Sequence, residues 1–254
     1  MPKLNYTISP AKKECLLFIH GFLGSMQQWE EISAKFSDGF QVLKIELPGH
    51  GNSMDSDVVY SINDLAHSVI QIIGQNNLKR VHLIGHSMGG YVASQVVAQY
   101  PERIKSLTMI NSIAGPDATE RVKNRNRSLK LIDRFKDAFV SMAVGNLFTS
   151  AEHEQFSSQI ENMKSQAQSI STDAVRKAIV AMRDRKGCLE LLDHTKGEIQ
   201  YIFSDSDEII PEQRVLNEIK DLKANGHKIK SGHMSILTHP DDIISILKTI
   251  LAGR

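Results

Sequence analysis

The fold follows from Val81-His82-Leu83-Ile84-Gly85-His86-Ser87-Met88-Gly89-Gly90, a short apolar run that stops in glycines around one serine. Residues 81–84 have the pattern of a buried strand, and residues 91–98 have that of a helix with an apolar face. Between them stands Gly-x-Ser-x-Gly, the pattern of a sharp strand-to-helix turn that exposes a nucleophilic serine. Such a turn strains the backbone, and its flanking positions need glycine because side chains would collide. We interpret Ser87 as a candidate nucleophile, against the alternative of a tight turn without chemistry.

Two apolar runs ahead of this turn also end in glycine-rich loops. Residues 15–19 and 42–47 have the pattern of buried strands, and the loops that follow them are His20-Gly21-Phe22-Leu23-Gly24-Ser25 and Pro48-Gly49-His50-Gly51-Asn52-Ser53. A weaker alternation over residues 4–9 predicts an opening edge strand. Ser61-Ile62-Asn63-Asp64 has the capping pattern of a helix start, and apolar residues recur at helical spacing from there to Gly74.

Strand and helix signals alternate as far as the apolar run 107–110, which favours an α/β fold. We expect a mostly parallel central sheet with helices on both faces. From residue 115 to residue 194 the signals are helical only, with apolar stripes formed by Val122, Leu129, Ile132, Phe135 and Phe139, by Phe156, Ile160 and Met163, and by Val175, Ile179 and Met182. We therefore predict an inserted helical cap over residues 115–194, between core segments 1–114 and 195–254. In the second segment, residues 199–203 and 227–230 predict strands, and a final helix begins at Pro240.

Composition indicates an ordinary globular protein of 254 residues, a length that one α/β domain can reach. Thirty basic and 29 acidic residues leave a formal charge of +1, which argues against a nucleic-acid or anionic-membrane partner. No apolar run approaches the length of a membrane span, and the first residues lack the pattern of a signal peptide, so we expect no membrane insertion and a cytoplasmic location. Cys15 and Cys188 stand far apart and fit reduced thiols rather than a disulfide framework.

A serine hydroxyl needs a base, and the base needs an orienting carboxylate. Asp207 follows the predicted strand 199–203, and His233 follows the predicted strand 227–230. Both would project from the carboxyl edge of a parallel sheet, where open α/β folds place their ligands. Asp205 and Glu208 are rival acids, and His227 and His239 are rival bases.

Other histidines have simpler interpretations. His82 and His86 have the spacing of a helical metal pair but fall on a strand and its turn, so we expect no metal site there. His20 and His50 are expected to brace their glycine loops. Phosphate-binding and dinucleotide-binding fingerprints are missing from the sequence, and the chemistry of a serine nucleophile requires no cofactor.

Five motifs stand in order outside the expected cap: His20-Gly21-Phe22, Leu47-Pro48-Gly49-His50-Gly51, Gly85-His86-Ser87-Met88-Gly89-Gly90, Asp207-x-Ile209-Ile210-Pro211 and Gly232-His233. With them the chain resembles the single-domain α/β-hydrolases that carry a helical cap. The resemblance implies that Ser87 is the nucleophile, His233 the general base and acid, and Asp207 the orienting acid, since Asp207 precedes the Ile-Ile-Pro pattern. It also implies an oxyanion hole built from the backbone N–H groups of Phe22 and Met88. One position departs from the family pattern, because Ser204 stands where glycine is usual three residues before the acid.

The leading hypothesis is a serine hydrolase that cleaves a small or medium carboxylic ester through an acyl-enzyme. An acyl thioesterase uses the same residues. A lyase or carbon-carbon bond hydrolase is a second alternative, because His20-Gly21-Phe22-Leu23-Gly24-Ser25 is similar to a loop of the menaquinone-pathway lyase of this superfamily, although His86 and Tyr91 replace the tyrosine and arginine usual there. A hydrolase-like small-molecule receptor is a third. Haloalkane dehalogenases and epoxide hydrolases are disfavoured, because they use a carboxylate nucleophile at the position of Ser87. The partner expected in each case is a small molecule, an acyl substrate for the esterase, and the oligomeric state stays open.

A basic stripe runs along the first expected helix of the cap, formed by Lys123, Arg127, Lys130 and Arg134. It has the charge to meet an acidic substrate, a coenzyme A phosphate or an acyl carrier protein. The apolar residues of the same helix project from its opposite side, so we interpret the stripe as a solvated face.

Overall fold

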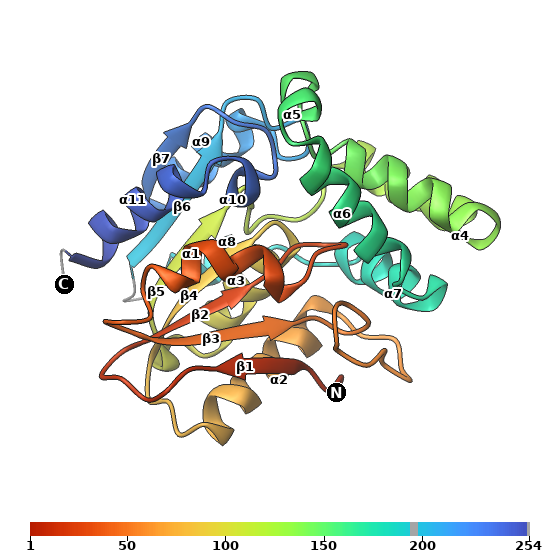
Figure 1. Ribbon diagram of the computed structural model, residues 1–254. Coiled ribbons are helices and arrows are strands. Elements are labelled where there is room, and N and C mark those ends of the chain that lie inside the picture. Colours follow the sequence, from red (N-terminus) through yellow and green to blue (C-terminus); the bar gives the residue numbers. More distant parts are fainter. Residues whose placement is uncertain (194–197, 253–254) are drawn as a thin grey trace.

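The computed structural model describes residues 1–193 and 198–252 (Figure 1). The predicted end of the cap at residue 194 and the predicted start of the second core segment at residue 195 lie outside the described residues.

Within the described residues, seven strands form one sheet in the order β1-β3-β2-β4-β5-β6-β7. Their bounds are β1 (Asn5–Ile8), β2 (Cys15–Ile19), β3 (Gln41–Glu46), β4 (Val81–His86), β5 (Ile104–Ile110), β6 (Glu198–Ser204) and β7 (Asn225–Ile229). β1 pairs antiparallel with β3 at one edge, and the remaining pairings of this sheet are parallel. The structure thus confirms the mostly parallel sheet and its opening edge strand.

Helices cover both faces of the sheet, as predicted. One face packs against α2 (Ile62–Gln75), α3 (Met88–Gln99), α8 (Leu189–Leu192) and α9 (Glu212–Leu222). The other packs against α1 (Glu30–Ala34), α10 (Ser235–Thr238) and α11 (Pro240–Ala252). The predicted start of α2 is confirmed by a capping box, in which the Ser61 hydroxyl accepts the N–H of Asp64 and the Asp64 carboxylate accepts the N–H of Ser61.

The inner strand β2 is apolar at every position because both of its faces are covered. Leu17 and Ile19 pack into the hydrophobic cluster on one face, and Leu16 and Phe18 pack into the cluster on the other. Because side chains alternate across a strand, helices on both faces require apolar residues at odd and even positions alike. This sandwich fixes the carboxyl ends of β4, β6 and β7, where the candidate site residues emerge.

Four helices connect β5 to α8: α4 (Thr119–Gly145), α5 (Ser150–Gln155), α6 (Ser157–Gln168) and α7 (Thr172–Arg183). Figure 1 shows α4, α6 and α7 packed together on the right of the sheet. The predicted stripes are confirmed by burial of Ile132, Phe139, Ile160, Met163, Val175, Ile179 and Met182.

The prediction for Phe135 is wrong, because this side chain is 59% exposed. Phe135 has non-helical φ −137° and ψ 38° and marks a kink that divides α4 in two. A stripe with a helical period keeps its phase only along an unbroken helix, so it fails at the break.

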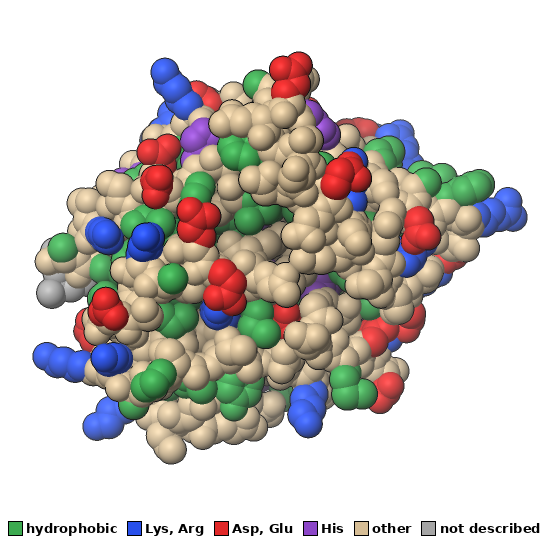
Figure 2. All heavy atoms as spheres, in the orientation of Figure 1, with side chains coloured by type: hydrophobic (Ala, Val, Ile, Leu, Met, Phe, Trp, Pro, Cys, Tyr) green, Lys and Arg blue, Asp and Glu red, His purple; other side chains and the backbone are tan. Residues whose placement is uncertain are grey.

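The surface carries both signs of charge. Figure 2 shows Lys and Arg side chains interspersed with Asp and Glu side chains over the visible face. The basic stripe of Lys123, Arg127, Lys130 and Arg134 is exposed, as predicted for a solvated face. None of the helices traced in residues 1–193 and 198–252 has the length and apolar character needed to cross a membrane.

Candidate active site

Ser87 lies at the turn between β4 and α3 with φ 50° and ψ −118°, a conformation that costs energy for any residue with a side chain. The glycines around it are required by close packing. A Cβ on Gly89 would overlap the carbonyl oxygen of Ile19, and a Cβ on Gly85 would lie 2.5 Å from the carbonyl oxygen of Gly89. The strand-turn-helix predicted from the motif is therefore present, with the serine side chain at its apex.

The structure brings the three predicted catalytic side chains together. The Ser87 Oγ lies 2.9 Å from His233 Nε2, and His233 Nδ1 lies 2.8 Å from Asp207 Oδ2. An ionised carboxylate only accepts hydrogen bonds, so Nδ1 carries the proton and Nε2 presents its lone pair to the serine hydroxyl. This is the arrangement in which an imidazole can remove the serine proton.

Asp207 is held as an ionised acceptor in a buried position. Its Oδ1 accepts the backbone N–H groups of Ile209 at 2.8 Å and Ile210 at 2.9 Å, and its Oδ2 accepts from Asn111 Nδ2 at 2.9 Å. Burial alone would raise the pKa of Asp207, but the neighbouring His233 and these hydrogen bonds hold it below its usual value.

The rival residues lie elsewhere. Asp205 and Glu208 are exposed on either side of the buried Asp207. His227 lies within β7 and its Nε2 is 3.1 Å from Gln200 Oε1, while His239 follows α10 and its Nδ1 is 2.9 Å from Thr238 Oγ1.

A polar network behind Asp207 was not anticipated. Asn111, at the end of β5 with φ 46°, donates from Nδ2 to Ser204 Oγ at 2.7 Å as well as to Asp207, and its Oδ1 accepts from Ser235 Oγ at 2.5 Å. Ser204, where the family pattern has glycine, also shares a 2.7 Å hydrogen bond with Ser231 Oγ. The serine that departs from the pattern is thus a member of the network. The only sequence signal was a polar Asn-Ser pair directly after a buried strand.

The loop after β2 is packed against the turn that carries Ser87. A Cβ on Gly21 would approach His86 Nδ1 to 3.0 Å and Ser87 Cβ to 3.1 Å, and Phe22 is the next residue of this loop. Met88 is the first residue of α3, and its N–H is one of the amides that lack an intrahelical acceptor. Both backbone groups predicted for an oxyanion hole therefore belong to segments that meet at Ser87.

Buried histidines brace these loops, as expected for His20 and His50. His20 Nδ1 contacts Gly21 O at 2.7 Å while Nε2 accepts the N–H of Leu47, and His50 Nδ1 contacts Pro48 O at 2.9 Å while Nε2 accepts the N–H of Leu23. His86 Nε2 lies 2.9 Å from the carbonyl oxygen of His233. Burial lowers the pKa of His20 and His86 to about 3 and that of His50 to about 4, which keeps all three neutral. Because a carbonyl accepts, His86 donates Nε2–H and holds the His233 backbone.

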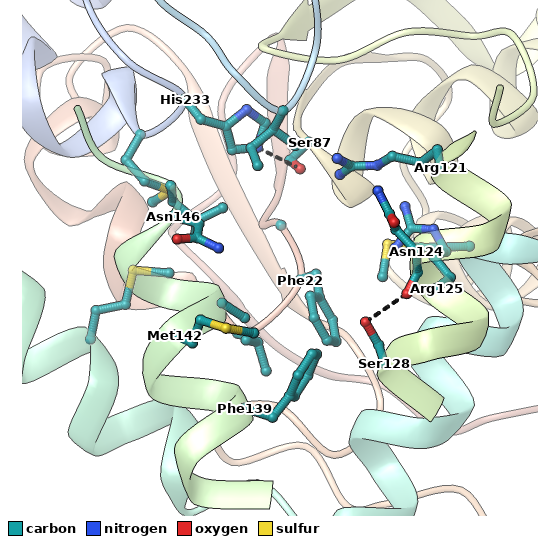
Figure 3. Close-up of a pocket in the computed structure, with 18 of the residues that line it drawn as sticks. Phe22, Ser87, Arg121, Asn124, Arg125, Ser128, Phe139, Met142, Asn146 and His233 are labelled. Carbon is teal, nitrogen blue, oxygen red and sulfur yellow. Dashed lines mark hydrogen bonds between the residues drawn. The ribbon is translucent and has the colours of Figure 1, made fainter. Parts of the chain in front are cut away.

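A cavity of about 370 Å³ opens above Ser87 and His233 (Figure 3). One wall is the first half of α4, with Arg121, Asn124, Arg125, Arg127 and Ser128. The opposite wall is the second half of α4, with Phe139, Met142 and Ala143, and Leu147, which follows it. Phe22 from the β2 loop, Met163 from α6 and Asn146, which follows α4, are among the other lining residues. This volume and mixed lining fit a small organic ligand.

Across the described parts of the chain, no group of three or more His, Cys, Asp or Glu side chains is placed to hold a metal ion. His82, the other half of the His pair, has Nδ1 2.7 Å from Ser106 Oγ. Cys15 and Cys188 are free and buried, and burial raises their thiol pKa values to about 12 and about 11, which makes them poor nucleophiles.

Fold and geometry together define the class: a mostly parallel α/β sheet with a serine, a histidine and a carboxylate in hydrogen-bond contact at its carboxyl edge. A family described as alpha/beta hydrolase fold matches residues 14–240, and the chain belongs to that family. The resemblance noted in the sequence is thereby confirmed.

Individual relatives are more distant. A putative esterase/lipase of Haemophilus influenzae is 38% identical over 113 residues, which are 42% of this chain and 39% of that protein. In three curated relatives the matched segment spans only 31 to 44% of the relative's length. Among solved structures, a thermophilic esterase from Thermogutta terrifontis has a TM-score of 0.91 at 22% identity, covering 98% of this chain and 93% of that one. An enol-lactonase from Burkholderia xenovorans has a TM-score of 0.90 at 17% identity, covering 98% and 96%. These structures show the shared fold.

Proposed function

We propose that this chain is a serine esterase that hydrolyses small or medium carboxylic esters through an acyl-enzyme. The observation that carries the proposal is the chain of hydrogen bonds from Ser87 through His233 to Asp207, which opens into the cavity. The H. influenzae relative, named as a putative esterase/lipase, and the esterase among the structural neighbours support ester chemistry.

In the proposed mechanism His233 Nε2 takes the Ser87 proton as Oγ attacks the ester carbonyl. Asp207 stabilises the imidazolium that forms. The N–H groups of Phe22 and Met88 donate to the carbonyl oxygen as it becomes negative, a contribution worth on the order of 3 kcal/mol for one donor. His233 then protonates the departing alcohol, and a water activated by the same imidazole releases the acid.

The helices α4 to α7 act in this proposal as the cap, because α4 supplies a large part of the cavity lining, to which α6 adds Met163 and α7 adds Met182. They would exclude water from the acyl-enzyme and select the substrate by size. In this proposal the three side chains carry out the proton transfer and the attack, the oxyanion hole stabilises the negative charge, and the cap selects the substrate.

The test is the hydrolysis of p-nitrophenyl esters from acetate to laurate at neutral pH. We expect turnover by the wild type and a loss on the order of 10⁴-fold or more in kcat for Ser87→Ala. Ser206→Ala is the matched control, because Ser206 is exposed and its hydroxyl bonds to the exposed Asp205. The optimum chain length would measure the cavity.

Coenzyme A thioesters belong in the same experiment, since the triad serves both leaving groups. Preference for the thioester would convert the assignment to an acyl thioesterase. A folded wild type that turns over neither class would contradict the proposal and favour the lyase or receptor alternatives.

A further inference from the structure

The wall of the cavity formed by the first half of α4 is cationic. It carries Arg121, Arg125 and Arg127, and the described residues that line the cavity include no aspartate or glutamate. Figure 3 shows Arg121 and Asn124 on this wall facing the side of the cavity where Ser87 and His233 lie. A small ligand in this space would therefore meet positive charge close to Ser87.

The arginines differ in what already neutralises them. Arg125 is buried, and its Nε donates to Asp117 Oδ2 at 2.5 Å. Asp117 also forms an ion pair with Arg185. Arg127 is 69% exposed and lies 3.5 Å from Glu120. Arg121 is partly buried, and within residues 1–193 and 198–252 it has no carboxylate partner. Its guanidinium points into the cavity toward Ser87 (Figure 3).

The opposite wall is mainly apolar. The kink at Phe135 lets one helix supply both sides, so that Phe139 and Met142 face the arginine wall across the cavity, with the uncharged Asn146 beside them. An uncharged acyl chain would satisfy only this apolar side and would leave the Arg121 guanidinium partly desolvated without a partner, which is unfavourable. A ligand with an apolar body and one anionic group matches both walls.

We propose that the substrate is an ester that carries a carboxylate, and that Arg121 binds this carboxylate and sets the specificity. The inference rests on the proposed esterase function and deepens it. Arginine suits the task because its planar guanidinium forms paired hydrogen bonds with a carboxylate. The carboxylate belongs either to the acyl part or to the alcohol part of the ester, and the experiment below distinguishes these two positions.

The experiment compares three esters by pH-stat titration: neutral ethyl hexanoate, monoethyl adipate with the carboxylate on the acyl chain, and carboxymethyl hexanoate with the carboxylate on the alcohol. We expect at least one anionic ester to exceed ethyl hexanoate in kcat/KM. In Arg121→Gln the ratio of kcat/KM for that anionic ester to kcat/KM for ethyl hexanoate should fall by about ten- to a hundredfold. Arg121→Lys should retain part of the ratio. Arg134→Gln, which removes the same charge from an exposed position of α4, should leave it unchanged.

A binding measurement separates this inference from the esterase proposal. Ethyl hexanoate, monoethyl adipate and carboxymethyl hexanoate are titrated calorimetrically into Ser87→Ala and into Ser87→Ala/Arg121→Gln. Binding of an anionic ester that is tighter than that of ethyl hexanoate, and that loses this advantage with Arg121→Gln, supports the anion site even if no ester is hydrolysed. Equal rates for all three esters, an unchanged ratio in Arg121→Gln, or equal binding of all three esters would overturn the assignment, whatever the outcome with Ser87→Ala.

Discussion

Asp207 is a buried carboxylate that is surrounded by hydrogen-bond donors. Its two oxygens together accept two backbone N–H groups, the Asn111 amide and the His233 imidazole, so that a buried carboxylate remains charged. That charge fixes the tautomer of His233, and in the proposed mechanism it would stabilise the imidazolium formed during acyl transfer.

Asp207→Asn should therefore lower kcat for ester hydrolysis by about 10³- to 10⁴-fold, because the amide favours the wrong tautomer of His233. The exposed neighbours supply matched controls, and Asp205→Asn and Glu208→Gln should retain near wild-type kcat. Steady-state kinetics with the best p-nitrophenyl ester decides between them. An Asp205 or Glu208 variant with the larger loss would show that the acid has been misassigned.

Some residues of the site could be predicted from the sequence, and others could not. The meeting of Ser87, Asp207 and His233 was predictable because each follows a strand at the same edge of a parallel sheet, while the Ile-Ile-Pro pattern of the family favoured Asp207 over its neighbours. Asn111 follows β5 at that edge too, but an asparagine after a strand has many ordinary roles in turns, so its position alone does not point to Asp207. Ser204 departs from the glycine of the family pattern. Its hydrogen bonds to Asn111 and Ser231 depend on the pairing of strands that are distant in the sequence, so the sequence alone did not predict them.

At the scale of elements, the short helix α5 is tied to the loop that carries His233. Glu152 is buried: its Oε1 accepts the Gly232 N–H at 2.9 Å and the Thr238 hydroxyl at 3.1 Å, while its Oε2 accepts the Thr149 N–H at 2.8 Å. One side chain thus caps its own helix and fixes the residue before His233. We predict that Glu152 is a positioning residue, which acts through the loop rather than on the substrate.

Glu152→Gln should reduce the free energy of unfolding by about 1–3 kcal/mol, since the new amide must turn an N–H toward a backbone N–H. It should also lower kcat more than it changes KM, because His233 loses its fixed position. Urea unfolding and steady-state kinetics measure the two effects. Glu154→Gln, an exposed change on the same helix, is the control. Identical behaviour of the two variants would remove the positioning role.

Element boundaries were predictable where local chemistry decides them. The Ser61 capping box begins α2 and Pro240 begins α11, as the sequence indicated. The kink at Phe135 contains no proline or glycine, and the apolar stripe continues through it. The local sequence therefore did not predict the break in α4. The pairing of the two halves of α4 across the cavity, and with it the exposure of Arg121 to the site, depended on that break.

On the scale of the whole molecule, the two hydrophobic clusters hold the sheet rigid while polar groups gather at its carboxyl edge. Three neutral histidines, His20, His50 and His86, lie buried between the loops of this edge. His20 and His50 connect the β2 loop to the β3 loop, and His86 connects the end of β4 to the His233 loop. The construction makes the edge stable near neutral pH and sensitive to acid.

The sign of the pH dependence follows from the lowered pKa values. An unfolded histidine titrates near 6.5, whereas the buried imidazoles stay neutral down to pKa values of about 3 for His20 and His86 and about 4 for His50. Below pH 6.5 the unfolded chain binds protons that the folded chain does not, so stability falls as the pH falls toward those folded values. At pH 5 each histidine costs about 2 kcal/mol, from 1.36 kcal/mol per pH unit.

His50→Asn tests this coupling because asparagine can still donate to Pro48 O but takes up no proton in this range. Urea unfolding at pH 7.5 and at pH 5 gives two free energies for each protein, and their difference should be about 2 kcal/mol smaller in His50→Asn than in the wild type. Ile244→Ala, which removes apolar contacts from a buried position of α11 without a titrating group, should lower both free energies equally and leave the wild-type difference intact. A His50→Asn protein with the full wild-type difference would mean that His50 is protonated in the folded state, and the neutral brace would have to be abandoned.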